Sequence, residues 1–435
     1  MTGEEQFDEG RLTRFHARLI TVAGLGTLFD SMDVGIVSFV MAALISAWRL
    51  NAFWIGIVGS INLVGMAIGA ALAGSLADRF GRRQLFMLTL LIYSVSTGLS
   101  GLSITLWMLL LFRFLVGVGL GGELPVTTTM VTEFLPRRDR GKGIVFLESF
   151  WAVGWLLAAV IAYVVIPHWG WRVAFFVGTL PALYVWYLRR GIPESPRYLL
   201  RQGRLAEAYR VMSMAAGREV AATSAPAARP HPGVGSLFQG RWTKRTIMLW
   251  ILWMGMNFAY YGMFLWLPSV LVEHGYSLVH SFAYTLIVTL VQIPGYFSAA
   301  WLVDRVGRKP VLIVYILATA IAASLFSHAH GVGDVLLYGC LLGFFNLGAW
   351  GVTYAYTTEQ YPTLIRGTGA GWAMGMGRIG GIVGPFLVGL MLASHVSIPG
   401  IFWIFTVVLL VVGLAVLILG RETRGRAMSE IEQGL

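Results

Sequence analysis

The stretches GSLADRFGRR, residues 74–83, and AAWLVDRVGRK, residues 299–309, share one pattern of charged residues and glycine. Both contain Asp-Arg-x-Gly-Arg followed by Arg or Lys, so that Asp78 corresponds to Asp304. A second pair, EFLPRRDRG at 133–141 and EQYPTLIRG at 359–367, shares Glu-x-x-Pro-x-x-x-Arg-Gly, so that Glu133 corresponds to Glu359 with the same spacing along the chain. Two different motifs repeated at one spacing indicate that the chain consists of two homologous halves.

Long apolar segments fill both halves. The 435 residues are 57% hydrophobic and 12% charged, whereas soluble proteins carry about 25% charged residues. Twelve apolar runs are long enough to cross ~30 Å of hydrocarbon as helices. They lie near residues 18–46, 53–77, 85–104, 106–134, 143–166, 171–190, 245–272, 281–303, 310–328, 332–358, 367–394 and 398–420. They lack the alternation of barrel strands, the other spanning structure. We therefore expect an all-α polytopic membrane protein with twelve transmembrane helices in two six-helix bundles.

The net charge of +11 predicts an orientation in the membrane. With the N-terminus placed inside, 28 of the 32 Lys and Arg residues fall on the inner side, the exceptions being Arg49, Arg113, Arg172 and Arg378. This is the positive-inside asymmetry, so the basic residues orient the protein and do not indicate nucleic-acid binding. We expect both termini to be cytoplasmic, and no cleavable signal peptide is visible.

The polar stretch between the halves contains AATSAPAARPHPG and is typical of a linker. The expected organisation is a cytoplasmic N-terminus at 1–17, an N-terminal bundle at 18–190, a cytoplasmic linker at 191–244, a C-terminal bundle at 245–420 and a cytoplasmic tail at 421–435.

Two parallel six-span halves resemble the major facilitator superfamily of transporters, and GSLADRFGRR is similar to the loop signature of that superfamily. We interpret the repeated charges as latches between helices that hold an outward-open state and break when the halves rock. The alternative is that they merely flank the membrane. The predicted gating residues are Asp78, Arg79, Arg82, Glu133 and Arg140 in the first half and Asp304, Arg305, Arg308, Glu359 and Arg366 in the second.

Six charged residues inside the spans have no counterpart in the other half: Asp30, Asp33, Arg113, Glu123, Glu148 and Arg378. A charge at the bilayer centre costs about 2.5–3.5 kcal/mol on insertion scales, so such residues pair or line a substrate or proton path. We expect Asp33 to pair with Arg113 as a mostly structural contact. The predicted proton-coupling residues are Asp30, Asp33, Glu123 and Glu148. A permanently ion-paired Asp30 is the structural alternative.

Residue counting places Asp30, Glu123, Trp155, Asn257, Asn346 and Arg378 near mid-membrane, where such transporters bind substrate. Arg378 is the best candidate for binding an anion, because its guanidinium can hold a carboxylate with two hydrogen bonds. The alternative is an arginine neutralised by Glu123 or Glu148. Nearby aromatic residues predict a slot for a flat ring, although they can also serve packing alone. The predicted substrate-binding residues are Arg378, Asn346, Asn257, Tyr261, Trp155, Trp151, Trp350 and Glu123.

The segment PESPRYL (193–199) resembles the sugar-porter branch, but the seventh span lacks the paired glutamines of sugar porters, so a sugar substrate is not expected. The Asp-x-x-Asp of the first span resembles the aromatic-acid–proton symporters. Nearly the whole chain, including LFDSMDVGIVSF, GLGGELPVTTT and GRIGGIVGPFLVG, looks like the bacterial niacin (nicotinate) transporters.

That resemblance implies uptake of nicotinate or a similar small aromatic carboxylate across the bacterial inner membrane, by alternating access and with proton symport. We expect a monomer that needs no cofactor. Without the resemblance, the residues themselves predict only that the substrate is a small planar anion. Other possibilities are import of another aromatic acid or organic ion, facilitated diffusion without protons, and a non-transporting receptor. A membrane-embedded enzyme is disfavoured, because the histidines and the single cysteine form no metal-binding spacing.

Overall fold

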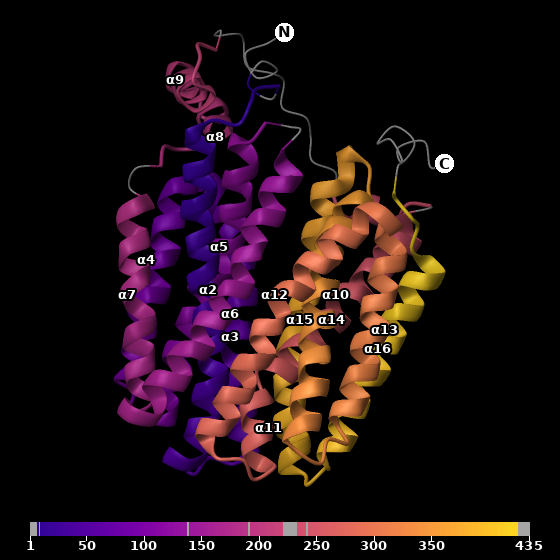
Figure 1. Cartoon of the computed structure of the whole chain (residues 1–435). Coiled ribbons are helices and arrows are strands. Elements are labelled where there is room, and N and C mark those ends of the chain that lie inside the picture. Colours follow the sequence, from indigo (N-terminus) through magenta and orange to yellow (C-terminus); the bar gives the residue numbers. More distant parts are fainter. Residues whose placement is uncertain are drawn as a thin grey trace. The chain divides into compact units, whose positions relative to one another are not determined.

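The computed structural model describes residues 7, 9–136, 139–189, 192–220, 233–240 and 242–424. All regular structure within these residues is helical (Figure 1). The helices are α2 (Arg14–Ala47), α3 (Ala52–Phe80), α4 (Arg82–Gly101), α5 (Leu106–Phe134), α6 (Arg140–Trp169), α7 (Trp171–Arg189), α8 (Pro196–Arg201), α9 (Leu205–Ala216), the 3-10 helix η1 (Val234–Phe238), α10 (Trp242–Phe264), α11 (Leu267–Glu273), α12 (Leu278–Val306), α13 (Arg308–Phe326), α14 (Val332–Glu359), α15 (Thr363–Ala393) and α16 (Ile398–Leu419).

Eleven of the helices in the described part of the chain are long and apolar enough to cross a membrane. The twelfth predicted span corresponds to α7, of which Trp171–Leu180 forms a shorter apolar helix among the described residues. The twelve-helix fold predicted from the sequence is confirmed. The predicted span 245–272 is not one helix, however, because α10 ends at Phe264 and α11 begins at Leu267, next to Pro268, whose nitrogen cannot continue the backbone hydrogen bonding.

The described part of the predicted linker contains the helices α8 and α9 and the 3-10 helix η1. Ser195 starts α8 by accepting a hydrogen bond from the backbone N–H of Tyr198, and Gly217 ends α9 with φ of 65°. The apolar face of α9 packs in one buried cluster with Phe7 and with the ends of α2 and α5. The Ala/Pro-rich segment 221–232 lies outside the described residues.

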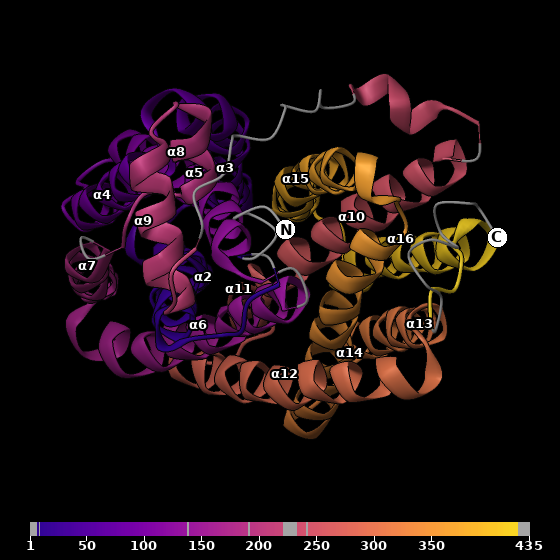
Figure 2. The same cartoon turned by 90° about the horizontal axis from the view of Figure 1, so that it is seen from above.

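The chain forms two compact units. Unit 1 contains Met1–Val34, Ile61–Trp155 and Gly170–Arg229, and unit 2 contains Gly35–Ser60, Leu156–Trp169 and Pro230–Leu435. Long helices α2, α3 and α6 therefore contribute to both units. In unit 2, α10 lies beside α15, α12 beside α14, and α13 beside α16 (Figure 2). We call the helix ends that carry the repeated motifs the motif ends, and the other ends the opposite ends.

Candidate transport site

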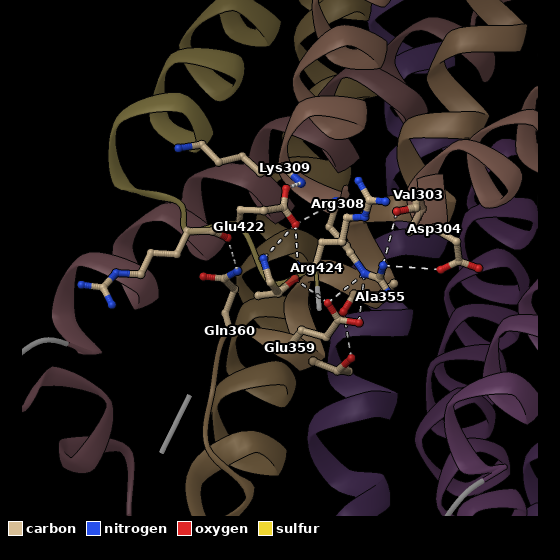
Figure 3. Close-up of polar contacts among 12 residues, drawn as sticks. Val303, Asp304, Arg308, Lys309, Ala355, Glu359, Gln360, Glu422 and Arg424 are labelled. Carbon is tan, nitrogen blue, oxygen red and sulfur yellow. Dashed lines mark hydrogen bonds and ion pairs between the residues drawn. The ribbon is translucent and has the colours of Figure 1, made fainter. Parts of the chain in front are cut away.

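The second copy of the repeated motifs forms a polar cluster where α12 ends and α13 begins (Figure 3). The Nε atom of Arg308 lies 3.1 Å from the carboxylate of Glu359, and its NH1 atom lies 3.4 Å from that of Asp304. Glu422 accepts hydrogen bonds from the backbone N–H groups of Arg308 and Lys309 at 3.0 and 2.9 Å. Because a carboxylate at a helix N-terminus satisfies free N–H groups and complements the helix dipole, Glu422 stabilises the start of α13.

The first copy forms an equivalent cluster in unit 1. The Nε atom of Arg82 lies 3.4 Å from Glu133, and its backbone N–H donates to Glu194 at 3.1 Å. Ser195 donates a side-chain hydrogen bond to Glu133. Gly81, at the start of α4, has φ of 94°, and a Cβ there would lie 2.5 Å from the Glu194 carboxylate. Glycine is therefore required for the carboxylate to reach the helix N-terminus.

The two clusters contain a third repeat that the sequence analysis missed. Glu194 and Ser195 in unit 1 have the same contacts as Glu422 and Thr423 in unit 2. These pairs are spaced slightly further apart along the chain than the two motifs are. A search at one fixed spacing misses them, although Pro-Glu-Ser and Arg-Glu-Thr at the ends of the two halves were available as a signal.

The other predicted gating residues are placed differently. The side chains of Asp78 and Arg140 lie outside the described residues. The remaining three make other contacts: Arg79 lies over the Phe80 ring at 5.4 Å, Arg305 lies over the Trp301 ring at 3.8 Å, and Arg366 donates to the carbonyl of Tyr361 at 3.3 Å.

The predicted ion pair between Asp33 and Arg113 is present inside unit 1. The two groups are 2.9 Å apart, and both side chains are almost completely buried. Arg113 also donates to Ser100 at 3.0 Å and to Thr97 at 3.3 Å, while Thr97 donates to the second oxygen of Asp33 at 2.7 Å. The guanidinium lies 4.5 Å from the Phe175 ring centre. Each charged group thus has several partners, as a stable buried ion pair requires.

Asp30 lies one turn before Asp33 on α2 and is only 2% exposed. Helix α6 approaches α2 closely at this level, since a Cβ at Gly154 would lie 2.1 Å from the carbonyl oxygen of Leu28. This approach places Trp155, next in the chain, close to the segment of α2 that carries Asp30. The other predicted residues of unit 1 are the buried Glu123 and Glu148 and the half-buried Trp151.

Glycine residues allow α15 to approach α10 in unit 2. A Cβ at Gly377 would lie 2.6 Å from Nδ2 of Asn257, and one at Gly381 would lie 3.1 Å from the Tyr261 ring. Both predicted residues of α10 therefore lie in the contact with α15. Nδ2 of Asn257 donates to the carbonyl of Trp253 on its own helix at 2.8 Å, so part of its hydrogen-bonding capacity is already used.

Arg378 lies on the face of α15 that also carries Gly371, Gly375 and Ile382. It is half-buried and forms no hydrogen bond or ion pair with any described residue of its own unit. One turn toward the opposite end, the carbonyl of Ile382 accepts a hydrogen bond from Ser60 of α3 at 3.0 Å. Toward the motif end, a Cβ added at Gly371 or Gly375 would meet no atom within 4 Å. The face is thus covered on one side of Arg378 and open on the other.

Helix α14 carries two predicted residues with unused polar atoms. Asn346 is 0% exposed, and neither its side-chain oxygen nor its nitrogen has a hydrogen-bond partner in the described part of the chain. One turn later, the indole nitrogen of Trp350 also has none there. The Trp350 ring lies 5.5 Å from Trp253, 5.9 Å from Tyr260 and 5.9 Å from Tyr354, measured between ring centres. Unit 2 therefore packs Trp350, one turn from Asn346 on α14, in one aromatic cluster with residues of α10.

Hydrogen bonds to main-chain carbonyls tie the opposite ends of helices together in unit 2. Ser38 on α2 lies 2.9 and 2.8 Å from the carbonyls of Phe264 and Leu265, where α10 is interrupted. The indole of Trp266 donates to the carbonyl of Pro385 on α15 at 3.0 Å. We call these contacts, together with that of Ser60 with α15, the opposite-end clamp. They join the first sequence repeat to the second, and no pattern in the sequence predicts them.

These features define a multi-pass membrane transporter of the major facilitator fold. A family model described as "Sugar (and other) transporter" matches residues 25–435. The niacin transporter NiaP of Acinetobacter baylyi is 49% identical over 424 residues, which cover 96% of this chain and 97% of that protein. The putative niacin/nicotinamide transporter NiaP of Bacillus subtilis is 48% identical and covers 94% of this chain and 96% of its own length.

More distant relatives and solved structures agree with the fold. The benzoate transport protein of Acinetobacter baylyi is 29% identical over 93% of this chain and 92% of its own length. A partially occluded inward-open structure of the xylose transporter XylE from E. coli covers 95% of this chain and 100% of that chain, with a TM-score of 0.80 and 22% identity. The chain belongs to the sugar (and other) transporter family of the major facilitator superfamily, and it is a transporter rather than an enzyme.

Proposed function

We propose that the protein imports nicotinate, or a closely similar small aromatic monocarboxylate, by alternating access and with proton coupling. The observation that carries the proposal is Arg378, a half-buried arginine with no hydrogen bond or ion pair to a described residue of its own unit. Such a guanidinium is ready to bind a carboxylate with two parallel hydrogen bonds. The niacin relatives of 49% and 48% identity supply the particular acid.

Aromatic residues and amides in unit 2 fit the rest of such a substrate. The ring of a planar acid packs well on Trp350 and its neighbours, since aromatic groups prefer stacked or edge-to-face contacts with one another. Asn346 has an amide donor and an acceptor available for a polar group on the ring. We also propose Asn257 and Tyr261 on α10 as part of the site. In unit 1, we separately propose Trp151, Trp155 and Glu123 as substrate-binding residues.

For proton coupling, we propose Asp30 as the residue that binds and releases the proton. Asp33 is held by Arg113 and the hydroxyl of Thr97, so its carboxylate is already engaged in the interior of unit 1. Asp30 is buried one turn earlier, and a carboxylate inside a span generally pairs or lines a substrate or proton path. Glu123 and Glu148 are further candidates on the same path. Protonation at Asp30 would offset the charge of the entering anion.

The membrane arrangement also remains a proposal. We infer that the protein lies in the bacterial inner membrane with both termini in the cytoplasm, because nearly all its Lys and Arg residues then lie inside. The motif ends would then be cytoplasmic. In that arrangement, the open face of α15 runs from Arg378 toward the cytoplasm, which suits release of substrate into the cell.

Uptake of radiolabelled nicotinate into proteoliposomes tests the proposal. We expect accumulation above equilibrium only when the outside is more acidic than the lumen, and none when the gradient is dissipated with a protonophore. Empty liposomes provide the baseline. Failure to take up nicotinate under either condition would contradict the proposed substrate. Equal uptake with and without the gradient would support nicotinate as the substrate but would contradict the proposed proton coupling.

Transport of benzoate is the second candidate function, because a benzoate transport protein is among the relatives. Competition by unlabelled benzoate in the same uptake assay distinguishes the two. Nicotinate should compete at lower concentration than benzoate if the protein is a niacin transporter, and the order should reverse if benzoate is the substrate.

A further inference from the structure

A buried glutamine on α12 has no role in the function described so far. Gln292 lies midway along α12 (Leu278–Val306) and is 1% exposed. Neither its side-chain oxygen nor its nitrogen has a hydrogen-bond partner in the described part of the chain. Its side chain lies against α14, because a Cβ added at Gly343 would come within 3.3 Å of its Cγ.

Other buried polar residues on the same helix are satisfied locally. The hydroxyl of Thr285 donates to the carbonyl of Ser281, and that of Thr289 donates to the carbonyl of Thr285, both at 2.8 Å. The side-chain amide of a glutamine has two donors and an acceptor, and in Gln292 neither the nitrogen nor the oxygen has a partner on α12 among the described residues. A buried polar group without a partner is destabilising by more than a made hydrogen bond contributes, so an unpartnered amide in a packed interior indicates that something else binds it.

Gln292 also breaks the internal repeat of the chain. Its counterpart in the first half, at the spacing of the two motifs, is Met66. A residue required by the shared fold would have the same character in both halves, as the motif residues have. Polar side chains inside a membrane protein generally serve a functional path when they are not part of its framework. The difference from Met66 therefore favours a role of Gln292 in ligand binding by the second half of the chain.

A second unpartnered amide lies at the same level of the adjacent helix. Asn346 is midway along α14 (Val332–Glu359), one turn beyond Gly343, where α14 meets Gln292. Together with the indole of Trp350, these residues place hydrogen-bond donors in the interior of unit 2 that have no partner among the described residues. Pro294 adds to the polar character, since it leaves the carbonyl of Leu290 without its helical partner.

We propose that Gln292 is a further substrate-selecting residue, which with Asn346 recognises the hydrogen-bonding edge of the aromatic ring. The ligand chemistry is a planar heteroaromatic carboxylate whose ring nitrogen accepts a hydrogen bond from a carboxamide N–H. Arg378 would bind the carboxylate, and Gln292 would distinguish a ring that has an acceptor nitrogen from one that has none. This inference rests on the proposed function, because it assumes that an aromatic acid is the substrate.

Binding measurements with the purified full-length protein in nanodiscs test the inference. The variants are Gln292→Met, which keeps the length but removes the amide, and the matched control Thr289→Val, which removes a buried hydroxyl satisfied within α12. A neutral hydrogen bond contributes about 0.5–1.5 kcal/mol, which corresponds to a roughly 2- to 10-fold change in affinity. We expect Gln292→Met to weaken nicotinate binding by that factor and to leave benzoate binding unchanged. Thr289→Val should alter neither.

Wild-type protein supplies a second measurement that does not depend on how a variant folds. If fixed amides recognise the ring nitrogen, moving the nitrogen to the ortho or para position should lower the affinity to that of benzoate. The inference is overturned if all three pyridine carboxylates bind equally, or if Gln292→Met keeps the wild-type preference for nicotinate over benzoate. Both results leave the proposed function intact. Failure of wild-type protein to bind any of these acids would instead refute the proposed function, and this inference with it.

Discussion

At the scale of single residues, Asp33 of α2 is held in a buried ion pair with Arg113. The ion pair of Asp33 with Arg113 was predictable, because unrepeated charges inside spans either pair with one another or line a substrate or proton path. Its hydroxyl partners Thr97 and Ser100 were not, since only the packing of α4 against α5 brings them within hydrogen-bonding distance. Residue type and depth predict which side chains are candidates, while the contacts of Asp33 with Arg113 and Thr97 are known only from the structure.

Asparagine substitutions at Asp30 and Asp33 should separate coupling from stability. We expect Asp30→Asn to abolish proton-driven accumulation and to retain nicotinate exchange between equal pools. Asp33→Asn should instead destabilise the protein, because removing one partner of a buried ion pair typically costs about 3–5 kcal/mol. Uptake, exchange and thermal unfolding of both variants provide the comparison. Accumulation by Asp30→Asn at the wild-type level, with unchanged pH dependence, would exclude a coupling role for this residue.

Arg378 should determine the preference for an acid over an amide. Nicotinate and nicotinamide have nearly the same shape, but only the acid can form charge-assisted bidentate contacts with a guanidinium. Hydrogen bonds to charged groups contribute about 1.5–3 kcal/mol, so nicotinate should bind roughly 10- to 150-fold more tightly. We expect Arg378→Ala to remove most of this preference.

Arg378→Lys should retain only part of the preference for nicotinate over nicotinamide, because an ammonium group lacks the planar pair of donors. Competition of both compounds against labelled nicotinate measures the preference. If nicotinamide competes as well as nicotinate in the wild type, Arg378 is not the anion-binding residue.

At the scale of helices, the repeated motifs predicted their charge clusters but not the carboxylates that complete them. Glu194 and Glu422 bind the N-termini of α4 and α13, yet their spacing along the chain differs from that of the motifs. The number of residues between a helix and the carboxylate that binds its N-terminus can vary, because the contact fixes only the position of the carboxylate. The sequence likewise does not predict which helix packs against a glycine such as Gly381, because the contact depends on the tertiary structure.

Glu359→Gln should loosen the second motif cluster, since it removes the ion pair with the side chain of Arg308. If the cluster holds the outward-open state, the variant should lower the labelling of a cysteine placed at Ala42, which is buried near the opposite end of α2. The measurement needs a Cys340→Ser background. A matched control is Glu207→Gln, which removes an exposed ion pair with Arg204 and should change little. Equal labelling in Glu359→Gln and the control would reject the gating role.

At the scale of the whole chain, hydropathy and the repeat predicted the helical membrane fold. Both signals can be read from one sequence alone, because hydropathy depends on local composition and the repeat depends on the spacing of the motifs. The compact units were not predictable in the same way, because the second includes Gly35–Ser60 from the first repeat. This grouping results from tertiary contacts such as that of Ser38 with the interrupted end of α10. A hydroxyl in an apolar run gives no indication of the distant carbonyl it will meet.

The opposite-end clamp should govern access from that side of the membrane. Ser38 and Ser60 are both buried and each donates to main-chain carbonyls. Replacing both with alanine should remove about 1–3 kcal/mol of stabilisation from the state in which these ends are joined. The equilibrium should then shift roughly 5- to 150-fold toward a state open at that end, which raises the labelling of the cysteine at Ala42. Ser281→Ala, which removes a buried hydroxyl bonded to its own helix, is the control.

Combining the clamp substitutions with Glu359→Gln gives the most stringent version of this prediction. The clamp and the motif cluster lie at opposite ends of the helices and share no residue, so their effects on the conformational equilibrium should add. Because one change favours opening at the opposite ends and the other favours closing there, labelling of the combined variant should lie between the labelling of its two parents. Labelling of the combined variant that matches the clamp variant alone would show that Glu359 does not act on the same equilibrium.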